Sequence, residues 1–183
     1  MSKEFEKEKN IDVKQAFLSN AIGDISSYIQ LVDTKVSIIM AAVVAIFVGA
    51  ATCNDPISEA IKKIQPCSWI GVFFMIISIL CLISIILVFL FGLLTVRGHS
   101  STIKYKSKWF IAQSAKEYSF NDYSKDIQKM TDEDIIINMA AELYKLNDIN
   151  RQKLKSFKWT LISFTAFLIS LAFIVVVIII NLI

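Results

Sequence analysis

The sequence predicts an all-α integral membrane protein with three transmembrane helices, the first and third of which extend into paired cytoplasmic helical stalks. Three long apolar runs, residues 36–53, 68–96 and 159–183, contain no Asp, Glu, Lys, Arg or His. Each run is long enough to cross a hydrocarbon core of about 30 Å as a helix. These runs should partition into lipid, because their apolar side chains favour insertion and no charge opposes it.

Residues 1–35 are predicted to form a cytoplasmic amphipathic helix. Its apolar residues recur at alternating intervals of four and three, which is typical of a helical packing seam. The seam residues are Leu18, Ile22, Ile25, Ile29 and Val32. Because no Pro separates this seam from the first apolar run, one helix of about 60 Å is expected from about Asp12 to Cys53.

Residues 54–67 are predicted to form a short outer loop with a small helix of its own. Asp55 is placed to cap that helix, Pro56 to occupy its first position and Pro66 to end it. One apolar stripe results, which is expected to lie on the bilayer surface. The stripe consists of Ile57, Ile61 and Ile64.

Residues 97–158 are predicted to be a cytoplasmic segment with a second helical stalk from about residue 132. Thr131 and Asp134 have the spacing of a capping box, and the acidic first turn suits the positive end of a helix better than a metal ion. A second seam of Ile136, Met139, Leu143 and Leu146 follows. The helix would reach Ile183 with a length of about 75 Å. Two stalks of similar reach should pack together.

An aromatic stretch precedes this second stalk. Aromatic residues at such density seldom remain in water, so the stretch is predicted to form a short helix or two folded against the stalks. Its apolar residues are Trp109, Phe110, Ile111, Tyr118, Phe120 and Tyr123.

The basic residues predict the orientation, because Lys and Arg near the ends of spans resist translocation. Of the 19 in the chain, five precede the first run and twelve lie in residues 97–158, whereas Lys62 and Lys63 alone occupy the loop. The N-terminus and residues 97–158 are therefore expected in the cytoplasm. The loop and the C-terminus are expected outside.

The composition argues against ion pumping and catalysis. Pumps and proton-coupled transporters usually carry an ionisable side chain at membrane depth, and none occurs in the three runs. The chain has a single histidine, His99, and no Gly-rich phosphate loop or nucleophile elbow. We therefore expect a protein that is not an enzyme and needs no metal or cofactor. Cys53 and Cys67 flank the loop, where a disulfide and two free thiols are both compatible with the sequence.

Small residues in the first run predict close contact between helices. Ala41, Ala45 and Gly49 recur at intervals of four and so share one helix face. Small side chains on such a face let two helix backbones approach one another in lipid. We therefore expect helix packing at this face and assembly into a homo-oligomer.

A polar patch interrupts the second seam near the membrane. Asn150 and Lys153 occupy the next two seam positions, and Tyr144, Asn147 and Arg151 lie close by in the sequence. One interpretation is that Asn150 sets the register of the helices, or that the helix emerges into water. The other is a small-ligand pocket, because Asn can pair with a base edge, Tyr can stack and Arg or Lys can hold a phosphate.

Two segments of the chain resemble a known family. LVDTKVSII leads into the first run, and the region from SAKEYSFNDYS to NRQKLKSFKW contains the second stalk. Together they resemble the membrane-spanning effectors of Pycsar antiphage defence, over roughly residues 18–173. Asp33 and Lys35 match an acidic and basic pair before a membrane helix, while Tyr123 and Lys153 match the second stalk. Val36 departs from the Ala that is typical of the family after the lysine.

The resemblance also implies a function for the chain. A partner cyclase would make cyclic CMP or cyclic UMP on phage infection, and the chain would sense that nucleotide as its activating ligand. Binding would impair the bacterial inner membrane and cause abortive infection. The ligand-binding residues would then be Asp33, Lys35, Tyr123, Tyr144, Asn147, Asn150, Arg151 and Lys153.

Two other functions are compatible with the residues alone. A membrane scaffold or assembly subunit would use the stalks to bind another protein and would need no nucleotide. A holin-like toxin would share the spans but would kill without any signal. No interaction with nucleic acid is expected in any of the three cases.

Overall fold

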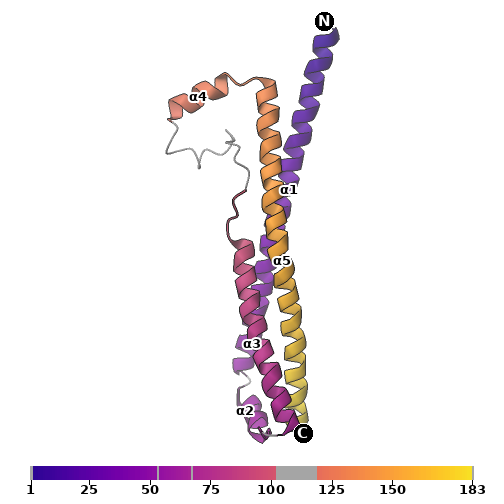
Figure 1. Ribbon diagram of the computed structural model, residues 1–183, viewed down its shortest axis with the longest axis vertical. Helices are drawn as coiled ribbons and strands as arrows, with labels where there is room; N and C mark the ends of the chain where they lie inside the picture. The colour runs from indigo at the N-terminus through magenta and orange to yellow at the C-terminus, as the bar shows by residue number, and fades with distance from the viewer. Residues whose placement is uncertain (1, 53, 67, 102–118, 183) are drawn as a thin grey trace. The chain divides into compact units, whose positions relative to one another are not determined.

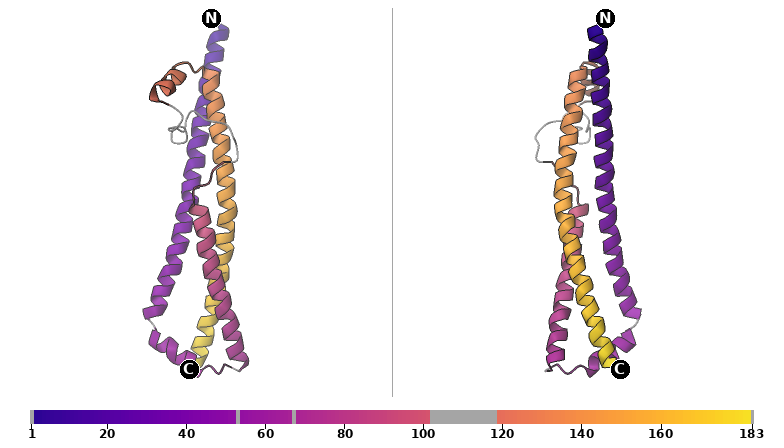
Figure 2. Two further views of the ribbon diagram at one scale, coloured as in Figure 1. Left: turned by 60° about the vertical axis from the view of Figure 1, so that its left-hand side comes forward. Right: turned by 90° about the vertical axis from the view of Figure 1, so that its right-hand side faces the viewer.

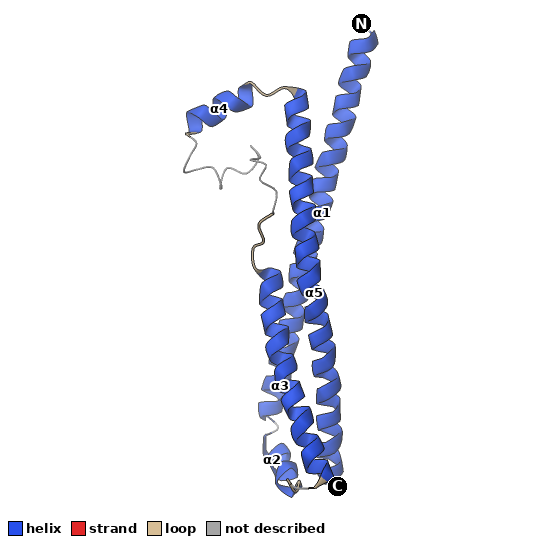
Figure 3. Ribbon diagram, viewed as in Figure 1, coloured by secondary structure: helices blue, strands red, loops and turns tan. Residues whose placement is uncertain are grey.

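The computed structural model describes residues 2–52, 54–66, 68–101 and 119–182, and every regular element among them is an α-helix (Figures 1 and 3). The helices are α1 (Ser2–Thr52), α2 (Asn54–Lys63), α3 (Trp69–Val96), α4 (Phe120–Gln128) and α5 (Asp132–Leu182). The all-α fold class is therefore confirmed. Four residues of the predicted aromatic stretch, Trp109, Phe110, Ile111 and Tyr118, lie outside the described residues, as do both loop cysteines.

Among the described residues, three helices are long and apolar enough to cross a membrane. They comprise Asn10–Thr52 within α1, all of α3, and Asp132–Asn181 within α5. The predicted number of transmembrane helices is thus confirmed. α1 begins about ten residues earlier than expected, at Ser2 rather than near Asp12.

The chain divides into two compact units, and α1 and α5 each contribute to both. The first unit contains Met1–Gln30 and His99–Arg151, and the second contains Leu31–Gly98 and Gln152–Ile183. Because both helices are continuous over 51 residues, neither has a break where one unit gives way to the other.

In the first unit, α1 and α5 run side by side in the same direction (Figure 2). Most seam residues are half-buried, Met139 is buried, and Asn138 and Glu142 are buried beside it on α5. The cap of α5 is the predicted one: the Thr131 backbone N–H donates to Asp134 Oδ2 at 3.0 Å and the Asp134 N–H donates to Thr131 Oγ1 at 3.3 Å. The assignment of these two segments as cytoplasmic stalks stays a prediction.

The second unit has an apolar core built by α1, α3 and α5. Val43 of α1, Cys81 and Val88 of α3, and Phe167 of α5 are buried together. Half-buried side chains surround them, namely Ile39, Ile46, Ile85, Phe89, Phe164, Leu171 and Ile174. All three candidate spans thus contribute to one core.

Gly92 of α3 lies close to α1, and this close approach depends on the absence of a side chain at this position. A Cβ atom at this position would lie 2.9 Å from Sδ of Met40 and 3.4 Å from Cγ1 of Val36. The predicted packing residues Ala41, Ala45 and Gly49 are instead exposed, and a Cβ atom on Gly49 would meet nothing within 4 Å. These residues thus make no close contact with the described part of the same chain, and their role in helix packing, including contact with a second chain, stays a prediction.

The loop helix α2 differs from the prediction in two respects. It begins at Asn54, so Asp55 lies in its first turn and is not its cap. Ala60 is fully buried while Ile57 and Ile64 are half-buried, and only Ile61 of the predicted stripe is exposed. The apolar side of α2 is therefore partly buried against protein, and its contact with the bilayer surface stays a prediction.

We expect Gly92→Leu to lower the stability of the second unit. The added side chain would force Met40 and Val36 to move, and overpacking of a core typically costs about 1–3 kcal/mol. Thermal unfolding in detergent micelles, followed by circular dichroism, measures the effect. Gly23→Leu is the matched control, since nothing lies within 4 Å of a Cβ atom there. Equal melting temperatures for the two variants would contradict the assignment.

Candidate functional site: a polar groove and a buried ion pair

A groove of about 410 Å³ lies between α1 and α5 in the first unit. Its apolar lining comes from Ala21 and Ile25 of α1 and from Leu143 of α5. Its polar lining is Asp24, Tyr28 and Asn147. Small-ligand sites typically have volumes of about 300–1000 Å³, with a few polar groups on a mainly apolar surface. The groove has this character.

The polar side chains of the groove offer an aromatic face and both kinds of hydrogen-bonding group. Nδ2 of Asn147 donates to the backbone oxygen of Leu143 at 2.9 Å, which leaves its second N–H and its side-chain oxygen available to a ligand. The Tyr28 ring is 47% exposed and Asp24 presents acceptors. Because no Lys or Arg is among the described residues that line the groove, it suits an uncharged heterocyclic edge better than a phosphate.

Among the described residues of the first unit, two buried acceptors of α5 have no hydrogen-bond partner. They are Oε2 of Glu142 and Oδ1 of Asn150. The Glu142 oxygen lies 3.8 Å from the Lys145 ammonium, which is too long for a hydrogen bond. A buried acceptor without a donor costs about 1–3 kcal/mol. The first unit therefore holds polar groups that a donor from a ligand or a water molecule would stabilise.

In the second unit, Lys153 of α5 forms an ion pair with Asp33 of α1. The Lys153 ammonium donates to both carboxylate oxygens at 2.6 Å. The lysine side chain is 7% exposed and the aspartate side chain 32% exposed. The pair joins two segments that lie 120 residues apart in the sequence. Two residues that sequence reasoning placed in one ligand site are thus brought together, but they are bonded to each other.

The other predicted site residues are dispersed. Lys35 and Tyr144 are exposed, and Tyr144 does not line the groove although it lies close to Asn147 in the sequence. Arg151 pairs with Asp148 at 3.2 Å while its own side chain stays 84% exposed. Tyr123 lies half-buried on α4. The predicted set is therefore divided between the two units, with Asp33, Lys35 and Lys153 in the second and the remaining residues in the first.

Sequence reasoning missed the contribution of α1 to the groove. Asp24 and Tyr28 each directly precede a seam residue, Ile25 and Ile29 respectively. Residues beside a seam flank the contact between two helices, so their pattern indicates the edge of an interface. The pattern that indicates the groove lies in α1, whereas the polar interruption of the second seam predicted a pocket from residues of α5.

The fold and these two features define an α-helical membrane protein with three candidate spans. The family model for the Pycsar effector protein domain matches residues 17–181, which include nearly the whole chain. The chain therefore belongs to the Pycsar effector family, which acts in antiphage defence. No curated protein and no solved structure matches it.

We expect the loss of Asp33 to destabilise the second unit more than the loss of Lys153. Asp33→Leu leaves a buried ammonium without a partner, whereas Lys153→Met leaves a carboxylate that water still reaches. Losing one partner of a buried pair costs up to about 3–5 kcal/mol, while replacing both by apolar residues is often neutral. Thermal unfolding in detergent should rank Asp33→Leu below Lys153→Met, with the double variant close to the native chain. The reverse order would contradict the burial on which this prediction depends.

Proposed function

We propose that this protein is a membrane effector that senses a cyclic pyrimidine nucleotide and then impairs membrane integrity. The nucleotide is cyclic CMP or cyclic UMP made by a partner cyclase during phage infection, and the outcome is abortive infection. The protein acts as a homo-oligomer in the bacterial inner membrane, with its N-terminus in the cytoplasm. It performs no catalysis.

The observation that carries this proposal is the extent of the family match. Residues 17–181 include the groove, the ion pair and all three apolar spans, so one family model covers both the candidate sensing and the candidate membrane parts. The spans contain no charged residue, so the proposed mechanism does not involve transport along a path of ionisable groups.

We place the base of the nucleotide in the groove of the first unit. The exocyclic amine of cytosine or the ring N–H of uracil would donate to Asp24, the free N–H of Asn147 would donate to a base carbonyl, and Tyr28 would stack on the ring. The phosphate would face solvent, because no Lys or Arg is among the described residues that line the groove. The exposed guanidinium of Arg151 is the nearest predicted phosphate partner along α5.

The signal would pass along the two continuous helices. A ligand shifts an equilibrium only if it binds one helix packing more tightly than the other. A groove formed by two helices meets this requirement, because a change in the spacing of α1 and α5 changes every contact to the ligand. Both helices run on into the spans, so a changed packing of the first unit would bias the packing of the second.

Expression with and without a pyrimidine cyclase tests the proposed function. We expect cells that carry both proteins to take up a membrane-impermeant dye, while cells that carry the effector alone exclude it. Uptake in both cultures would instead identify a holin-like toxin that needs no signal. Uptake in neither would identify a scaffold. A cyclase with an inactivated catalytic site is the control for the burden of expression.

Binding to the purified protein tests the position of the site. We expect Tyr28→Leu to weaken the binding of cyclic CMP or cyclic UMP about tenfold or more, because base stacking on an aromatic ring contributes about 1–3 kcal/mol. Tyr144→Leu is the matched control, since this tyrosine is exposed on the same unit outside the groove. Isothermal titration in detergent measures both.

The same titration separates the groove from the polar patch. If the double variant Asn150→Ala, Arg151→Ala loses binding while Tyr28→Leu retains it, then the patch of α5 is the site and the groove is not.

A further inference from the structure

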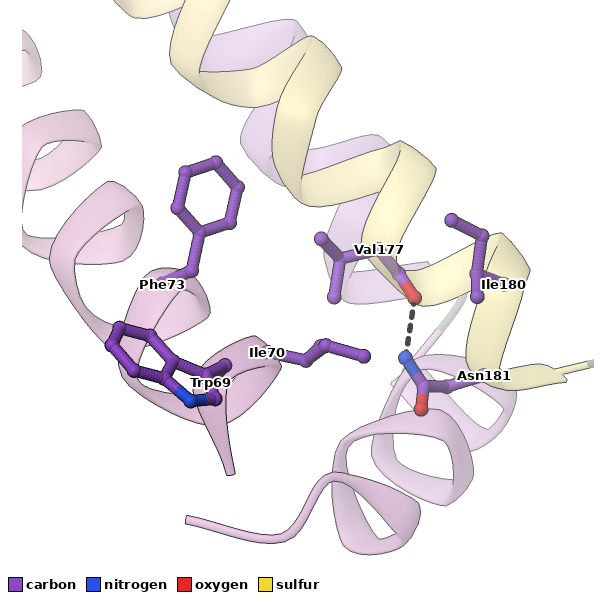
Figure 4. A pocket seen from close by; sticks show the side chains of 6 residues that line it. All are labelled: Trp69, Ile70, Phe73, Val177, Ile180 and Asn181. Atoms are coloured by element: carbon purple, nitrogen blue, oxygen red, sulfur yellow. Dashed lines mark hydrogen bonds between the residues drawn. The ribbon is translucent and has the colours of Figure 1, made fainter. Parts of the chain in front are cut away.

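A second pocket lies at the end of the second unit where α3 begins and α5 ends. Its volume is about 350 Å³, and it is lined by Trp69, Ile70 and Phe73 of α3 and by Val177, Ile180 and Asn181 of α5 (Figure 4). Trp69 is the first residue of one candidate span and Asn181 the last of another. The pocket therefore lies at a boundary between hydrocarbon and headgroups.

The pocket is continuous with the surface that the bilayer covers. Ile70, Phe73 and Ile180 line it and are also about half exposed, at 51%, 48% and 62%. Trp69 is 93% exposed at its edge. In a bilayer the neighbours of such a surface are acyl chains, and an apolar void without atoms to fill it forfeits dispersion contacts.

The polar groups of the pocket are confined to one side. Nδ2 of Asn181 is bonded to the backbone oxygen of Val177 at 2.8 Å, which leaves the amide oxygen as the acceptor of this side chain. In Figure 4 this oxygen and the Trp69 indole nitrogen lie toward the end of the helices, away from the Phe73 ring. The pocket thus has a hydrocarbon part and a polar edge, and a phospholipid has the same order of groups.

We propose that this pocket binds one acyl chain of a phospholipid. The methylene groups next to the ester fill the space between Phe73 and Val177, and the Trp69 indole N–H donates to the ester carbonyl. Tryptophan is enriched at the headgroup level for this combination of an apolar ring and one donor. A helix from a second copy fits less well, because a helix has no free backbone donors or acceptors for the polar edge.

Native mass spectrometry of the full-length protein tests the proposal. The purified, delipidated chain is incubated in detergent micelles with phosphatidylethanolamine at a small molar excess. We expect one retained lipid for each chain. Ile180→Trp should lose it because the larger side chain fills the pocket. Ile179→Trp should retain it, since this neighbouring residue is 52% exposed and does not line the pocket.

Three outcomes would overturn the proposal. They are equal lipid retention by the two variants, no lipid on the native chain, and a dimer mass that appears in place of the bound lipid. A variant with Trp69 as its single tryptophan adds a direct readout, because a phospholipid brominated near the ester should quench its fluorescence at stoichiometric lipid. Absence of quenching while lipid is retained would place the lipid elsewhere and also overturn the proposal.

Discussion

The constraint on which this structure depends is the absence of water from a bilayer interior. Every backbone N–H and C=O in that region must be paired within the protein, and a continuous helix is the simplest solution. Hydroxyl side chains follow the same rule here, because Ser84, Thr95 and Ser170 each donate to a backbone oxygen four residues earlier on the same helix. The spans therefore require no polar contact with one another, and packing of their side chains shapes the core of the second unit.

Where a charged side chain is buried in this unit, a second requirement applies. An ammonium that is almost fully buried needs an anionic partner, and Asp33 satisfies the Lys153 side chain with both of its oxygens. The pair thereby selects one relative rotation and one register of α1 and α5. A seam of Ile, Leu and Val residues would tolerate small slips, whereas a buried pair at 2.6 Å does not.

The spans, the loop helix and the cap of α5 could be predicted because each depends on local physics. Hydropathy and length identify the spans, and the Thr131–Asp134 spacing identifies the start of α5. The groove could not be predicted in the same way, because Asp24 and Tyr28 meet Asn147 only after two segments more than 100 residues apart have packed. Gly92 was missed for a related reason: its sequence neighbours are large, and only the position of Met40 makes its missing side chain important. The face of Ala41, Ala45 and Gly49 has the expected pattern, yet these residues are exposed in the described part of the chain.

Because α1 and α5 run side by side in the same direction, the lengths of insertions that these helices tolerate are also limited. A single inserted residue turns everything downstream in a helix by about 100°, so an insertion between Tyr28 and Asp33 would carry the carboxylate away from Lys153. An insertion of seven residues returns the downstream helix face almost to its starting angle. Tolerated length differences among related sequences should therefore come in steps of about seven residues, and an insertion in one helix should be matched by an equal insertion in the other.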